Sequence, residues 1–113
     1  MLTIKPWGSY QTILTEPNYK VKRIIVYPQQ QLSYQYHNHR KETWKIISGQ
    51  GIFTLNETQY DAYPEMVFNI NIQDRHRIQT ISDDPIVFIE VQTGICDEED
   101  IVRLEDDYGR VTD

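Results

Sequence analysis

The chain has 113 residues, of which 39% are hydrophobic and 25% charged, with five glycines and five prolines. This length and composition predict one folded domain and exclude a two-domain enzyme, a collagen-like fibre and a disordered segment. The net charge of -6 arises wholly in residues 97–113, where eight acidic residues stand against two arginines. An acidic chain without a basic stripe indicates that nucleic acid is not a partner.

Apolar runs reach only about five residues, too short to span a membrane. No basic and then apolar leader follows Met1, so no secretory signal is expected. The single cysteine, Cys96, excludes an internal disulfide framework and a cysteine-only zinc site. We therefore expect a cytoplasmic protein with no membrane partner.

Short segments rich in β-branched residues follow one another along the chain. They predict strands that are separated by turn residues, at 20–27, 42–47, 52–55, 66–70, 76–81 and 86–92. Ser48–Gly51 is a turn signal, which predicts a hairpin between the second and third of these strands. Such regular spacing predicts an all-β fold with a single antiparallel β-barrel or jelly roll.

The two ends of the chain are expected to flank this barrel within one domain, residues 1–113. Residues 1–19 are expected to form an N-terminal arm, packed on the barrel through Trp7 and Tyr10, and residues 20–94 the barrel itself. Residues 95–113 form an acidic C-terminal tail. Its segment Asp97–Leu104 opens with four acids, which favours a short helix, although an ordered tail without a helix fits equally well.

Candidate metal ligands gather in the segment Leu32–Trp44 and one later strand. On a strand, alternate residues point to one face, which here carries Gln35, His37 and His39. A reversal at Arg40-Lys41 can return Glu42 to that face, and His76 lies on a later strand. Two imidazoles and a carboxylate that converge inside a barrel can bind a divalent metal with positions left open.

The spacing Gln35-x-His37-x4-Glu42, with His76 later, resembles the metal site of the cupin superfamily. More closely, the chain resembles the C-terminal isomerase domain of type II mannose-6-phosphate isomerases, which is usually fused to a mannose-1-phosphate guanylyltransferase. The resemblance rests on five segments in the same order: Lys5–Tyr10, Leu32–Trp44, His76–Gln79, Glu90–Gly94 and Glu99–Arg110.

This resemblance implies a metal-dependent isomerase that interconverts mannose 6-phosphate and fructose 6-phosphate through an enediolate. It implies zinc as the cofactor, held by Gln35, His37, Glu42 and His76, with His39 as the alternative ligand. When Gln35 and His37 are the ligands, as we prefer, His39 is free to act as the acid–base catalyst. It also implies a homodimer, because cupins often pair and the N-terminal arm offers a strand to exchange.

The sugar phosphate of such a reaction needs cationic side chains. The candidates for phosphate binding are Arg40, Lys45, Arg77, Arg103 and Arg110. The arginines of the acidic tail can instead form ion pairs with neighbouring acids. Arg77 should point away from His76 by strand alternation, which favours a structural role.

The chain also departs from the family pattern at three places. Thr43 stands where the family has histidine, Glu65 where a turn glycine is usual, and Asn71–Gln73 where Pro-x-Gly is usual. These departures favour an alternative, a non-catalytic metal-binding cupin that binds a sugar phosphate or nucleotide sugar. A third possibility is another metal-cupin reaction, such as that of an iron oxygenase.

Overall fold

The computed structural model describes residues 2–110, and these form strands and turns without a helix. The described residues therefore include no helix that could cross a membrane. The strands are β1 (Leu2–Lys5), β2 (Gly8–Glu16), β3 (Tyr19–Val26), β4 (Tyr34–Tyr36), β5 (Arg40–Ser48), β6 (Gly51–Leu55), β7 (Thr58–Ala62), β8 (Val67–Ile70), β9 (His76–Thr80), β10 (Ile86–Gly94) and β11 (Val102–Glu105).

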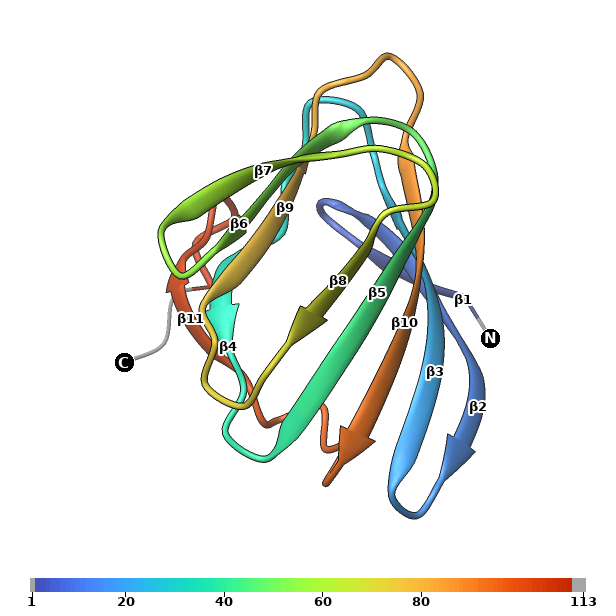
Figure 1. Cartoon of the computed structure of the whole chain (residues 1–113), viewed down its shortest axis with the longest axis vertical. Helices are drawn as coiled ribbons and strands as arrows, with labels where there is room; N and C mark the ends of the chain where they lie inside the picture. The colour runs from blue at the N-terminus through green and yellow to red at the C-terminus, as the bar shows by residue number, and fades with distance from the viewer. Residues whose placement is uncertain (1, 111–113) are drawn as a thin grey trace.

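Two antiparallel sheets face each other across the core (Figure 1). The first has six strands in the order β1-β2-β3-β10-β5-β8, and the second has five in the order β11-β4-β9-β6-β7. Strands that are distant in sequence, such as β3 and β10, are neighbours in the same sheet. This arrangement confirms the predicted all-β jelly roll.

The inward faces of the two sheets are apolar at one end of the barrel and polar at the other. On β5, strand alternation points Trp44 and Ile46 inward together with Glu42, and all three are buried. Trp44 stacks on Phe88 with ring centroids 4.3 Å apart and meets Phe53 edge-on at 5.4 Å. The aromatic core therefore directly adjoins the buried carboxylate and supports it.

The predicted hairpin between β5 and β6 is wrong. These strands lie in different sheets, and the chain crosses between the sheets at Ser48–Gly51. The crossing packs too closely for side chains, since a Cβ on Gly51 would lie 1.9 Å from the Gln79 carbonyl oxygen. The hairpin in this region is instead β6–β7, which turns at Asn56 and Glu57, both with positive φ. Strand β7 was not predicted.

The N-terminal segment forms β1 and β2, which extend the first sheet beyond β3. Met1 and residues 111–113, which the predicted arm and tail include, lie outside the described residues. In the C-terminal segment, the alternative of an ordered tail holds and the helix over Asp97–Leu104 is wrong. Val102–Glu105 instead pairs with the short strand β4, with Arg103 opposite Gln35, because that edge of the second sheet offers backbone partners.

Candidate metal centre and adjoining pocket

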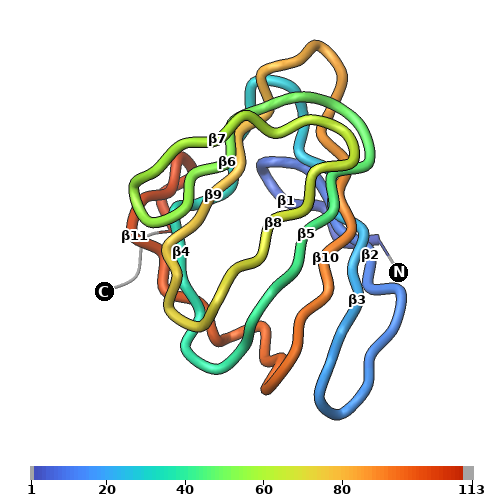
Figure 2. The backbone as a smooth tube through the Cα atoms, in the orientation of Figure 1, coloured from blue at the N-terminus to red at the C-terminus, as the bar shows by residue number. Residues whose placement is uncertain are grey.

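The turn between β4 and β5 carries His37 and is held by the C-terminal segment. Strand β4 ends at Tyr36, so residues 37–39 form the turn. The Asp100 carboxylate accepts the backbone N–H groups of Asn38 and His39, each at 2.9 Å. The backbone N–H of Gln73, in the β8–β9 turn, donates to the His37 carbonyl oxygen at 2.8 Å. Figure 2 shows both turns at the same end of the barrel.

Three buried side chains converge beside this turn. His37, Glu42 and His76 place one potential ligand atom each within 4.8 Å of one another. His37 Nε2 lies 3.2 Å from Glu42 Oε2, and His76 Nε2 lies 3.8 Å from Glu42 Oε1. The two histidines and the glutamate are at most 2% exposed. The grouping that the sequence indicated for these three residues is thus present.

Both imidazoles are oriented by backbone carbonyls. His37 Nδ1 lies 2.5 Å from the Asp100 carbonyl oxygen, and His76 Nδ1 lies 2.9 Å from that of Asp74. Since a carbonyl only accepts, each Nδ1 carries the proton and each Nε2 presents a lone pair toward Glu42. Burial lowers the pKa of both histidines to about 4, which keeps them neutral near pH 7.

These features fit a divalent metal. Neutral histidines whose second nitrogen is held by a carbonyl are the state in which imidazole binds metal. His76 Nε2 is buried and has no hydrogen-bond partner, so a group that accepts its lone pair is missing. The residues present can therefore hold a divalent metal.

The Glu42 carboxylate accepts hydrogen bonds from two side chains. Arg40 Nε donates to Glu42 Oε2 at 2.8 Å, and Trp44 Nε1 donates to Glu42 Oε1 at 2.9 Å. Arg40 Nη2 also lies 3.4 Å from His37 Nε2. The Trp44 indole reaches a second carboxylate, Glu90, at 3.2 Å. Burial, together with the nearby Glu42 carboxylate, raises the pKa of Glu90 to about 8.

The other predicted ligands lie around this group. Gln35 is the register partner of His76 on the adjacent strand, and its amide oxygen accepts the Ser33 hydroxyl at 2.6 Å. His39 is exposed and does not join the group. The alternation that placed it beside His37 requires a continuous strand, which the turn interrupts. Thr43 points outward and donates to Asn69, so the absent family histidine leaves the group intact.

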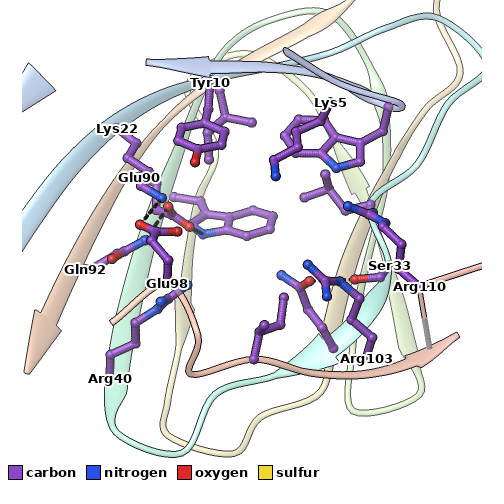
Figure 3. Close-up of a pocket in the computed structure, with 16 residues that line it drawn as sticks. Lys5, Tyr10, Lys22, Ser33, Arg40, Glu90, Gln92, Glu98, Arg103 and Arg110 are labelled. Carbon is purple, nitrogen blue, oxygen red and sulfur yellow. Dashed lines mark hydrogen bonds and ion pairs between the residues drawn. The ribbon is translucent and has the colours of Figure 1, made fainter. Parts of the chain in front are cut away.

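A pocket opens next to this group, between β1, β3, β10 and β11. Five cationic side chains line it: Lys5, Lys22, Arg40, Arg103 and Arg110. Figure 3 shows Lys5, Arg103 and Arg110 on one wall, facing Lys22, Glu90 and Glu98 on the other.

Several of these cationic side chains form ion pairs with carboxylates. Lys22 pairs with Glu98 at 2.5 Å, and Arg110 pairs with Asp106 at 2.9 Å. Within residues 2–110, Lys5 and Arg103 form no ion pair, and Arg103 Nε is buried without a hydrogen-bond partner. Burial also lowers the pKa of Arg103. This wall of the pocket is therefore suited to an anion.

The phosphate candidates divide between this pocket and other surfaces. Arg40, Arg103 and Arg110 line the pocket. Lys45 is exposed and pairs with Glu65 at 3.2 Å. Arg77 donates to the Leu32 carbonyl oxygen at 3.0 Å and lines a separate groove.

Sequence reasoning missed two lining residues, Lys5 and Lys22. Lys22 carried a usable signal, because it alternates on β3 with the buried residues Ile24 and Val26. A lysine in an inward register indicates a buried polar site.

Comparison with known proteins places these features in a wider group. A family model described as "Mannose-6-phosphate isomerase C-terminal" matches residues 2–106. Mannose-1-phosphate guanylyltransferase ManC of Salmonella typhimurium is 38% identical over 109 residues, which are 95% of this chain and 22% of that protein. Alginate biosynthesis protein AlgA of Pseudomonas aeruginosa is 37% identical over 110 residues, 96% of this chain and 23% of that protein. The chain thus spans about a fifth of these relatives.

Solved structures agree on the fold. The capsular polysaccharide assembling protein CapF of Staphylococcus aureus superposes with a TM-score of 0.83 at 20% identity, over 94% of this chain and 34% of that chain. The Cnp3 cupin domain of Schizosaccharomyces pombe superposes with a TM-score of 0.76 at 13% identity, over 81% and 68%. At these identities the likeness shows the cupin fold alone.

The expected function, interconversion of mannose 6-phosphate and fructose 6-phosphate, is corrected by these relatives. Salmonella ManC, which covers nearly the whole chain, is named as a mannose-1-phosphate guanylyltransferase and not as an isomerase. The matching region is only a small part of that protein. The motifs that suggested the isomerase therefore identify the domain, and a shared domain does not fix its reaction.

Proposed function

The chain belongs to the family described as mannose-6-phosphate isomerase C-terminal, and from this premise we propose that it serves the synthesis of a mannose nucleotide beside a guanylyltransferase module. The full-length relative ManC is named for guanylyl transfer to mannose 1-phosphate, a reaction whose substrates and products all carry phosphate. In this role the pocket of the present chain holds a phosphate group of one of these anions.

The unpaired cations of the pocket support this proposal most strongly. Arg103 Nε is buried and unpartnered, and Lys5 lies on the same wall. A phosphate oxygen supplies the acceptor that the guanidinium lacks, and Arg donates to phosphate through a planar pair of N–H groups. Arg110 keeps its ion pair with Asp106 and supports the wall from the side.

The opposite wall suits the uncharged part of such a ligand. Glu90 and Gln92 are buried polar residues on β10, and Tyr10 lies above them on β2. Their oxygens can accept hydrogen bonds from sugar hydroxyls. A sugar phosphate would then lie across the pocket, with its phosphate toward Arg103 and its hydroxyls toward β10.

Calorimetric titration tests this proposal with GDP-mannose, mannose 1-phosphate and inorganic phosphate. We expect Arg103→Gln to weaken binding of each anion roughly tenfold or more, because it removes a charge-assisted hydrogen bond. Lys45→Gln is the matched control, since Lys45 is exposed and lies outside the pocket. Equal binding by wild type and Arg103→Gln, or no binding by wild type, would refute the proposal.

We also propose that His37, Glu42 and His76, with Gln35 as a fourth ligand, hold zinc. The two imidazoles and one carboxylate are donors that zinc accepts. A bound zinc ion would supply positive charge that polarises an oxygen of the ligand in the adjoining pocket. The chain's own part is to keep both histidines neutral and their Nε2 atoms aimed at Glu42.

Elemental analysis of the purified protein tests the metal and its ligands together. We expect stoichiometric zinc in wild type and in His39→Ala, and its loss in His76→Ala. His39→Ala is the matched control because His39 is the exposed alternative ligand. Metal that survives His76→Ala but is lost in His39→Ala would reject this ligand set, and iron or copper in place of zinc would reject the metal.

A further inference from the structure

Arg40 contacts Glu42 at the same carboxylate oxygen that faces His37. We propose that Arg40 and a divalent cation exclude one another at Glu42, and that cation binding turns the Arg40 guanidinium into the basic pocket, where it strengthens anion binding. The coupling rests on the proposed metal and phosphate sites. The exclusion rests on the geometry of Arg40 itself.

The group of His37, Glu42 and His76 has no positive charge of its own while both histidines are neutral. His37, Glu42 and His76 each place one potential ligand atom within 4.8 Å of the other two. His37 Nε2 and Glu42 Oε2 are both acceptors and lie only 3.2 Å apart. Arg40 is the cation in contact with both, through Nη2 and Nε respectively. Its guanidinium therefore stands where a metal would otherwise provide the charge.

Arg40 and a metal on Glu42 would oppose one another. A metal on Glu42 Oε2 would compete with Arg40 Nε for that oxygen and bring a second positive charge within a few ångström in a buried site. Metal binding also removes the His37 Nε2 lone pair that Arg40 Nη2 approaches at 3.4 Å. Arg40 would then lose its contact with His37 and be held less strongly by Glu42.

The pocket beside Arg40 offers open space into which its guanidinium can turn. Its Nη1 donates to the Asp97 carbonyl oxygen at 3.1 Å, and its side chain lines the pocket. Figure 3 shows it below Glu98 and Gln92, at the edge of the open space. A rotation of the side chain would move the guanidinium into that space while the backbone of β5 stays in its sheet. The pocket would then gain a cation that Glu42 no longer neutralises.

NMR of the wild-type protein tests the exclusion without relying on a variant's folding. The Arg40 side-chain Nε–H signal, assigned by its absence in Arg40→Lys, should shift and lose protection from solvent exchange as zinc is added. An unchanged signal at stoichiometric zinc would overturn the proposal. Failure to bind zinc in wild type supports it only if Arg40→Met then binds zinc, and overturns it otherwise.

Metal affinity provides the second test, by competition with a coloured chelator. We expect Arg40→Met to bind zinc about tenfold more tightly than wild type, because the competing cation is gone. Lys41→Met is the control, since Lys41 is the exposed neighbour on β5. A folded Arg40→Met with unchanged or weaker affinity would contradict the exclusion. If Arg40→Met does not fold, the NMR titration decides.

The coupling is measured with mannose 1-phosphate on zinc-loaded, desalted protein and on chelator-treated protein. Zinc should raise the affinity of wild type several-fold more than that of Arg40→Met, because the direct attraction of the zinc charge for the anion is common to both proteins and the movement of Arg40 occurs only in wild type. Equal affinity of wild type with and without zinc would overturn the coupling but leave the proposed phosphate site standing. No binding in either state would defeat the proposed function and the coupling, while the NMR titration would still decide the exclusion.

Discussion

At the residue scale, three buried titratable side chains oppose one another in their effect on stability. The pKa of His37 and of His76 falls from 6.5 to about 4 on folding, because burial disfavours the charged imidazole. The pKa of Glu90 rises from 4.5 to about 8, because burial and the Glu42 carboxylate disfavour the charged carboxylate. Between pH 4 and 6.5 the unfolded chain binds protons at the histidines. Between pH 4.5 and 8 the folded chain binds one at Glu90.

These shifts predict that the metal-free protein is most stable near pH 6.5. Below this pH the free energy of unfolding should fall, because two histidines favour the unfolded chain and outweigh the single glutamate. Above it, Glu90 acts alone, and stability should fall by at most about 1.4 kcal/mol per pH unit up to pH 8. Urea unfolding of chelator-treated protein at several pH values measures the profile.

The variant Glu90→Gln isolates the alkaline side of this profile. Its amide oxygen can still accept the Trp44 indole N–H, so the hydrogen bond at 3.2 Å has a replacement. We expect the fall above pH 6.5 to disappear while the fall toward pH 4 remains. A wild-type protein whose stability stays constant from pH 6.5 to 8 would contradict the raised pKa of Glu90.

At the scale of elements, the two turns around β8 retain a backbone shape that favours glycine. Glu65 has φ of 78° and Gln73 has φ of 66°, both in the left-handed region. These residues lie where the resembling family usually has turn glycines. The chain has therefore replaced the residues but kept the turns. The Gln73 turn matters for the site, because its N–H holds the His37 carbonyl.

Glu65→Gly and Gln73→Gly should each stabilise the protein. Relief of the left-handed strain outweighs the greater flexibility of glycine in the unfolded chain, with a net gain of about 0.5–1 kcal/mol. For a domain of this size, that gain raises Tm by roughly 2–5 °C in thermal unfolding. Asp61→Gly, an exposed strand residue with negative φ, is the control and should be destabilising. Lower Tm in both turn variants would contradict the argument.

Residue composition explains which strands could be predicted from the sequence at this scale. The β-branched content of these segments, with turn residues between them, correctly placed β3, β5, β6, β8, β9 and β10. It missed β7, whose residues Thr58–Asp61 are all exposed and so carry no inward pattern. The hairpin after β5 failed because Gly49 and Gly51 serve a close crossing between sheets, which has the same composition as a hairpin turn.

The candidate site was only partly predictable, for a related reason. The spacing His37-x4-Glu42, with His76 later, is visible in the sequence, and the structure brings the three residues together. The pocket is not visible in the sequence, because it joins Lys5 of β1 to Arg103 of β11, and these strands lie in different sheets. Local periodicity cannot bring together two strands that never pair. The Arg40–Glu42 contact was hidden as well, because a reversal was expected at Arg40-Lys41, whereas β5 already begins at Arg40 and alternation places it on the face of Glu42.

At the scale of the whole molecule, the edge of the six-stranded sheet is available for pairing. Strand β1 pairs with β2 on one side and with no other strand of the described chain. Its alternate residues Leu2 and Ile4 are 55% and 64% exposed, and Ile13 on the adjacent β2 is 57% exposed. An apolar edge strand of this kind favours pairing with another strand. The homodimer expected from the sequence stays a prediction, and β1 is the surface that we expect to form it.

If two copies pair through β1, Ile4→Lys should yield a monomer in light scattering at concentrations where wild type is dimeric. The charge would lie in an apolar contact of both partners, and a two-fold interface places it there twice. Ile81→Lys is the matched control, because Ile81 is 51% exposed but lies beyond the end of β9. Lys5 points into the pocket from the same strand. Pairing that fixes β1 should therefore also tighten anion binding, so Ile4→Lys should weaken it even though Ile4 does not line the pocket. A wild-type monomer, or a dimer that survives Ile4→Lys, would contradict pairing through this edge.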